Sequence, residues 1–208
     1  MTAAAPSPVP TSRAERVALA DLLAELGPEQ PTRCEGWTTR DLAVHLVVRD
    51  RRPDAVPGLA LGGPLAGWSE RVVAGVRARP FPDLVADVRS GPPSWAPTSW
   101  PAVDRLVNTV EMVVHHEDVR RVQPGWAPRD LPADVQDQLW RSVPLLARAN
   151  ATGTAGGLVA VRTDSPAGTS VRRLRTGTPV TRVAGPPLEV LLWVSGRQDV
   201  ARVEVTGG

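Results

Sequence analysis

The pattern of apolar residues changes near Asn150, and this change limits the folds open to the chain. Before Asn150, apolar residues recur at spacings of three and four, as in helices that bury one face. After it come short β-branched runs divided by Gly and Pro. The 208 residues, 42% of them hydrophobic, are enough for a substantial core. We therefore predict an α+β protein with a helical domain over 11–150 and a small α+β domain over 155–208.

Helix start signals define the elements of the first domain. Ser12 with Glu15, and Thr38 with Asp41, have the spacing of a capping box. Pro101 is suited to the first position of the longest helix, which we expect to run to about Arg121. Further helices are expected over about 68–77, 83–89 and 132–147, and the Pro- and Gly-rich stretch 52–67 is expected to be a long functional loop.

The second domain is predicted to alternate strands with one helix. Four short runs have strand character and are separated by Gly and Pro turns. The strands are expected over 158–161, 171–174, 180–183 and 203–205, and the helix over 187–194.

Charge and cysteine content exclude several classes of protein. The 24 basic and 22 acidic residues leave a net charge of only +2, which disfavours nucleic acid as a partner. The single cysteine, Cys34, allows no internal disulfide and fits a reducing compartment. We find no secretory signal in 1–10 and no apolar run long enough to span a membrane. The expected location is the cytoplasm, with no membrane association.

Three side chains form a candidate metal site. Glu111 and His115 lie one helical turn apart and project from the same face, and His45 lies on a separate helix. Two imidazoles and one carboxylate suit zinc, nickel or iron and leave coordination positions open. His116 lies about 140° around the helix axis from Glu111 and so points away from that face. Asp118 or Glu117 could accept a hydrogen bond from the other ring nitrogen of His115.

An ordinary structural interpretation competes with the metal site. A Glu-x-x-x-His pair often arises by chance on a solvated helix face. With three histidines in the chain, and valines around Glu111, that explanation loses weight because an unpaired carboxylate among apolar side chains is costly. For Trp37 a core position is favoured over a pocket wall. For Cys34 a buried, inert thiol is favoured over a reactive thiol or an additional ligand.

Two segments resemble a known family. The run PTRCEGWTTRDLAVHL over 31–46 and the run NTVEMVVHHEDVRR over 108–121 are similar to the mycothiol-dependent maleylpyruvate isomerase family, in the actinobacterial metal-binding branch of the DinB-like proteins. The segment 185–197 is similar to part of a sterol carrier protein. The resemblance implies a DinB-like up-down four-helix bundle followed by a sterol-carrier-protein-like domain.

The resemblance also implies a chemistry. It assigns a divalent metal to His45, Glu111 and His115, with mycothiol as a thiol cofactor in the open position. The thiolate would attack a small anionic or electrophilic substrate, as in an isomerase or S-transferase. The resemblance places Arg197 near the site, where an arginine could orient a carboxylate.

Two functional classes are compatible with the sequence. One is a metal-dependent enzyme that activates a low-molecular-weight thiol. The other is a non-enzymatic protein that binds a metal or a small ligand. A helical DNA-binding regulator is disfavoured by the balanced charge and the lack of a recognition helix.

Overall fold

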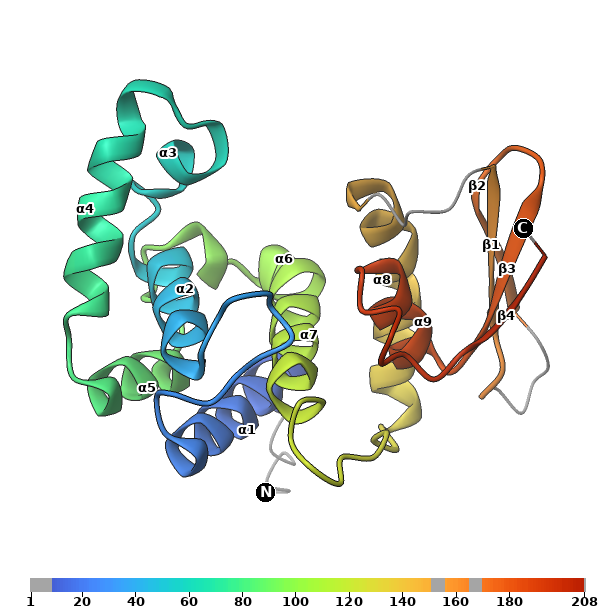
Figure 1. Ribbon diagram of the computed structural model, residues 1–208, viewed down its shortest axis with the longest axis horizontal. Coiled ribbons are helices and arrows are strands. Elements are labelled where there is room, and N and C mark those ends of the chain that lie inside the picture. The colour runs from blue at the N-terminus through green and yellow to red at the C-terminus, as the bar shows by residue number, and fades with distance from the viewer. Residues whose placement is uncertain (1–8, 151–155, 165–169, 208) are drawn as a thin grey trace, which may run out of the picture. The chain divides into compact units, whose positions relative to one another are not determined.

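The α+β fold class is confirmed. A computed structural model of the chain describes residues 9–150, 156–164 and 170–207, with helices first and a small sheet near the C-terminus (Figure 1). Its internal contacts divide it into two units, Met1–Trp126 and Ala127–Gly208. Among the described residues, no helix has the length and apolar character that crossing a bilayer requires.

The first unit is built from helices around one apolar core. Leucines at the centre of the core, such as Leu19, Leu42 and Leu84, are fully buried. The helices are α1 (Thr11–Leu26), α2 (Thr39–Arg51), α3 (Val56–Leu61), α4 (Ala66–Arg77), α5 (Phe81–Ser90), α6 (Pro101–Val103) and α7 (Thr109–Arg120), with the short 3₁₀ helices η1 (Gly63–Leu65) and η2 (Pro97–Ser99) and the π-helical segment η3 (Asp104–Asn108).

The predicted capping box at Ser12 is wrong. Helix α1 follows Pro10 and has no side-chain cap. Ser12 Oγ instead donates to Asp104 Oδ2 at 2.6 Å, and Glu15 Oε2 lies 2.9 Å from His116 Nδ1. Both side chains are buried, and their polar groups link α1 to η3 and α7 instead of capping the N-terminus of α1.

The predicted capping box at Thr38 is confirmed. Thr38 Oγ1 accepts a hydrogen bond from the backbone N–H of Asp41, and the Asp41 carboxylate accepts one from the backbone N–H of Thr38. The box therefore fixes the first turn of α2, the helix that carries His45.

Removal of this cap gives a testable loss of stability. We expect Thr38→Ala to lower the free energy of unfolding by about 1 kcal/mol, because one backbone donor of α2 loses its acceptor. Thr38→Ser keeps the hydroxyl and should stay close to the wild type. Urea denaturation of the three proteins measures the difference. Equal stability of the alanine and serine variants would show that the cap contributes nothing.

The predicted long loop over 52–67 contains two short helices. Pro57 and Pro64 stand in the first turns of α3 and η1, where the missing backbone N–H costs nothing. A Cβ at Gly58 would overlap Ser69 Oγ and the carbonyl of Leu65. The Pro and Gly residues therefore permit tight helical packing here, whereas we interpreted them as loop signals.

The longest predicted helix is continuous but contains a π-helical segment. Helix α6, the π-helical η3 and helix α7 together cover the predicted range 101–121 to within one residue. At the end of η3, Asn108 donates to Asp104 Oδ1 at 2.9 Å and accepts from Arg49 Nη2 at 2.8 Å. Such bulges are frequent beside functional sites, and Glu111 follows three residues later.

The second unit contains the sheet, and the predicted strands and helix are confirmed with small shifts at their ends. The strand order is β2-β1-β3-β4, with β1 parallel to β3 and the other pairs antiparallel. The elements are α8 (Ala133–Ala149), β1 (Gly157–Arg162), β2 (Ser170–Arg175), β3 (Val180–Gly185), α9 (Pro187–Val194) and β4 (Glu204–Thr206).

Helix α8 groups with the second unit. We predicted a domain boundary between 150 and 155, but the contacts place it between Trp126 and Ala127. The reason is that α8 packs on α9 and touches β2. The backbone N–H of Leu188 in α9 also donates to the side chain of Gln136 in α8, at 3.0 Å.

Candidate metal centre

The three predicted ligands converge within the first unit. His45 Nε2 lies 3.0 Å from Glu111 Oε1, and His115 Nε2 lies 3.4 Å from the same oxygen. All three ligand atoms lie within 4.8 Å of one another. Ligand atoms about 2 Å from one shared zinc ion are separated by comparable distances. The geometry therefore allows His45, Glu111 and His115 to hold one cation.

Two helices set these positions. Glu111 and His115 are one turn apart on α7, and His45 extends from α2 toward them. The imidazole rings of His45 and His115 are 5.3 Å apart in an edge-to-face arrangement, and the Trp37 ring lies 5.2 Å from the His45 ring. The two imidazoles are thus held by ring contacts as well as by the carboxylate.

The charges within the cluster stabilise one another. Burial alone would raise the pKa of the Glu111 carboxyl, but hydrogen bonds with His115 and His45 and the charges of His115 and Arg49 hold that pKa far below its usual value. Burial alone would lower the pKa of His115, yet hydrogen bonds, first of all with Asp118, raise it well above the usual value. The cluster is therefore a carboxylate enclosed by cationic groups.

A buried ion-pair chain extends from the cluster into the core. Arg49 Nε lies 3.5 Å from Glu111 Oε1, and Arg49 Nη1 lies 2.8 Å from Asp50 Oδ1. Asp50 also pairs with Arg16 Nη1 at 2.6 Å. We did not identify this chain from sequence. The available signal is that Asp50 continues the apolar stripe of Leu42 and Leu46 at a spacing of four.

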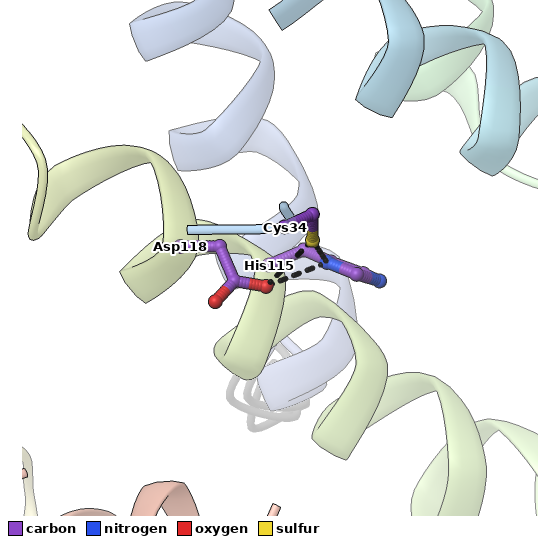
Figure 2. Close-up of side chains that lie close together, drawn as sticks. All are labelled: Cys34, His115 and Asp118. Carbon is purple, nitrogen blue, oxygen red and sulfur yellow. Dashed lines mark hydrogen bonds and ion pairs between the residues drawn. The ribbon is translucent and has the colours of Figure 1, made fainter. Parts of the chain in front are cut away.

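Asp118 orients the imidazole of His115 (Figure 2). His115 Nδ1 lies 3.0 Å from Asp118 Oδ2, which confirms Asp118 as the partner of the second ring nitrogen. Glu117, the other candidate, is bound 2.5 Å from Arg121 Nε instead. With Nδ1 held by Asp118, Nε2 is the His115 atom that faces Glu111, and it is the atom that would bind a metal ion once it has lost its proton.

Cys34 lies against the same pair of side chains. Its thiol donates to Asp118 Oδ2 at 3.3 Å, and Sγ is 3.8 Å from His115 Nδ1 (Figure 2). Cys34, His115 and Asp118 also bring ligand atoms within 4.8 Å of one another, so they form a second group able to hold a metal. The thiol is partly exposed and hydrogen-bonded, which differs from the buried, inert thiol that we favoured.

Substitution of Asp118 tests whether this residue orients His115 or binds the metal itself. If Asp118 orients His115, Asp118→Asn should weaken zinc binding about 10- to 100-fold, as is typical of partners behind a ligating histidine. Cys34→Ala should then leave the affinity within a few-fold of the wild type. Competition with a zinc-sensitive chelating dye measures both. A larger loss of zinc affinity with Cys34→Ala than with Asp118→Asn would favour a metal bound by Cys34, His115 and Asp118.

A pocket of about 480 Å³ opens beside His45. Trp37 forms part of its wall and is 37% exposed, so the predicted core position of this tryptophan is wrong. The remaining apolar wall comes from Val44, Val48, Val56 and Val73. The arginines at the pocket already have acidic partners: Arg77 pairs with Asp41, and Arg49 pairs with Asp50.

Arg197 belongs to the second unit. It follows α9, and its Nη1 donates to the carbonyl oxygen of Ser195 at 2.6 Å. This contact neither supports nor opposes a role in substrate recognition, which stays a prediction.

In the first unit, two histidines and a glutamate from two helices converge, as expected of a helical protein that binds a divalent metal. The family described as mycothiol maleylpyruvate isomerase N-terminal domain matches residues 12–104, so this part of the chain is similar to that family. The match supports the DinB-like assignment of the first unit. It includes His45 and ends before Glu111. No curated protein and no solved structure matches the chain.

Proposed function

We propose that the protein binds a divalent metal through His45, Glu111 and His115 and uses it to activate a low-molecular-weight thiol. The supporting observation is that Nε2 of both histidines and Oε1 of Glu111 gather within 4.8 Å, from two different helices. His45 also lines the 480 Å³ pocket, so a reactant in that pocket would contact a metal ligand. The similarity of residues 12–104 to a mycothiol-related family favours mycothiol as the thiol.

The donor set fits a catalytic ion. Two imidazoles and one carboxylate match three-ligand zinc sites, which keep a position open for solvent or substrate. Zinc is our first choice, and nickel and iron share the same donor preferences. When bound, such an ion acts as a Lewis acid that lowers the pKa of a coordinated thiol. The three side chains hold the ion, and Asp118 keeps His115 in the required tautomer.

The pocket favours an electrophile with an apolar body. Its wall is mainly valine and tryptophan, and the cations Arg49 and Arg77 already pair with carboxylates of the protein. A neutral acceptor can therefore bind without displacing an ion pair. An anionic acceptor would have to compete with Asp41 or Asp50 for an arginine. We propose thiol transfer or addition to such a substrate, in a cytoplasmic protein whose partners are small molecules.

Two measurements on the zinc-loaded protein test the proposal. Isothermal titration calorimetry should show mycothiol binding that is lost after chelation. Turnover of mycothiol with a neutral chloronitroarene should also require the metal. Metal binding without either result would support the alternative, a non-enzymatic metal-binding protein. Binding of no metal would contradict both.

Trp37 offers a test of the pocket that leaves the ligands intact. We expect Trp37→Ala to raise KM for the chloronitroarene about tenfold, because the loss of one buried aromatic face removes a kcal/mol or more of contact. Metal content should stay at one ion per chain. Steady-state kinetics and metal analysis on the same sample measure the two effects. An unchanged KM would place the acceptor outside this pocket.

A further inference from the structure

A second pocket, of about 470 Å³, lies against α2 and α4 in the first unit. The two helices pack side by side (Figure 1), and the pocket shares both with the pocket at His45 but no lining residue. Its lining includes four arginines and no acidic residue. The arginines are Arg51, Arg52, Arg71 and Arg79.

Nearby carboxylates compensate only part of this charge. Asp87 is shared, at 3.2 Å from Arg51 Nη2 and 2.7 Å from Arg79 Nη1. Asp54 pairs with Arg52 at 2.7 Å. Among the described residues, three of the four guanidinium groups pair with these two carboxylates, and the pocket keeps an excess of positive charge.

Arg71 has donors available to a ligand. Within the described part of the chain, Arg71 has no acidic partner, and its Nε donates only to the Gly67 carbonyl of its own helix, at 3.0 Å. Arg51 differs, because its Nε is buried and its Nη2 already donates to Ser90 Oγ and to the Gly91 carbonyl. Arg51 therefore contributes its charge to the pocket, and Arg71 supplies the donors that an anion can reach.

The pocket also has an apolar wall. Val47, Val72 and Val76 are buried beside it, and Trp68 is 46% exposed at its edge. The Trp68 ring lies 6.0 Å from the Arg52 guanidinium carbon. An aromatic ring or a short apolar chain could pack against these side chains while its charged group meets the arginines.

Gly75 keeps the pocket open. It stands inside α4, where glycine destabilises a helix by roughly 1 kcal/mol relative to alanine. A Cβ at this position would meet no atom within 4 Å, and its φ is not in the left-handed region. Neither packing nor backbone conformation therefore requires glycine here. Its effect is to leave free volume between the arginines.

We infer that this pocket is a binding site for a small organic anion, one that carries a phosphate or carboxylate group on an apolar or aromatic body. Arginine recognises either oxyanion through paired N–H donors. Arg71 would bind the anionic group with the charge of Arg51 nearby, and Trp68 with the three valines would contact the body. The site is separate from the metal ligands and does not depend on the function proposed for them.

Calorimetry on the full chain in EDTA, which prevents a metal from binding the anion, tests this inference. Phenyl phosphate and benzoate are the anionic probes, and benzyl alcohol is the neutral one. At least one anion should bind with one site per chain and should weaken as salt is added. The anion that binds more tightly identifies the preferred group. Failure of both anions to bind at millimolar concentration, or equal binding of benzyl alcohol, would overturn the inference.

Three substitutions locate the binding. Arg71→Gln should weaken it about tenfold or more, because a charge-assisted hydrogen bond is lost. Gly75→Leu should abolish it by filling the pocket, and the open space at Gly75 lets the variant fold. Arg89→Gln on α5 removes the same charge from an exposed pair with Asp21 and should change the affinity less than twofold. Equal losses for Arg71→Gln and Arg89→Gln would indicate nonspecific attraction and would contradict the site.

Discussion

Glu111→Gln is expected to lower zinc affinity by more than about 100-fold, beyond the range typical of partners behind a ligand. The substitution keeps the size of the side chain but replaces an anionic ligand with a neutral amide. Glu111 Oε1 is the atom that both imidazoles approach, at 3.0 and 3.4 Å, so its loss affects the whole cluster. Metal analysis after dialysis and a dye-competition titration measure the effect.

Two histidines on α7 provide a matched control. His115→Gln removes a ligand, and His116→Gln changes the adjacent residue, whose Nδ1 lies 2.9 Å from Glu15 instead. We expect the first variant to lose the metal and the second to keep one ion per chain. Melting curves of the metal-free proteins should show that both are folded. Equal metal content in the two variants would place the ion elsewhere.

Asp50→Ala is expected to destabilise the metal-free protein by about 3–5 kcal/mol, the range for a buried ion pair that loses one partner. Asp50 is 2% exposed and Arg16 is 4% exposed, and they lie 2.6 Å apart between α2 and α1. Without the carboxylate, the Arg16 guanidinium stays buried beside a cavity with no balancing charge. Urea denaturation measures the change in the free energy of unfolding.

The double variant Arg16→Met with Asp50→Leu separates the missing charge from the missing volume. It should recover most of the stability, since apolar side chains of similar size can replace a buried pair. Arg89→Ala, at an exposed pair with Asp21, should cost less than about 1 kcal/mol. If Asp50→Ala also costs less than about 1 kcal/mol, water reaches the Arg16–Asp50 pair.

Features encoded over a single helical turn were predictable from the sequence. Glu111 and His115 face the same way because four residues make about one turn, and His116 is directed to Glu15 for the same reason. The Thr38 box was predicted because both of its hydrogen bonds are local. That His45 meets the pair depends on the tertiary fold, because His45 and Glu111 are 66 positions apart in the chain. Family resemblance supported that contact, and helical spacing could not.

Features that depend on contacts between distant residues were missed. Ser12 and Glu15 have a capping-box spacing, but Asp104 and His116 bind their side chains across the core. Arg16 and Asp50 are 34 positions apart, and each is of a type usually found in solvent. The boundary after Trp126 likewise depends on the packing of α8 on α9, which the helical pattern of α8 does not reveal.

An anomalous-scattering map from a zinc-loaded crystal tests the central claim most directly. The account predicts one peak per chain, about 2.0–2.2 Å from Nε2 of His45, a carboxylate oxygen of Glu111 and Nε2 of His115. A peak bounded by Cys34 Sγ, Nδ1 of His115 and Asp118, or the lack of any peak near α7, would contradict it.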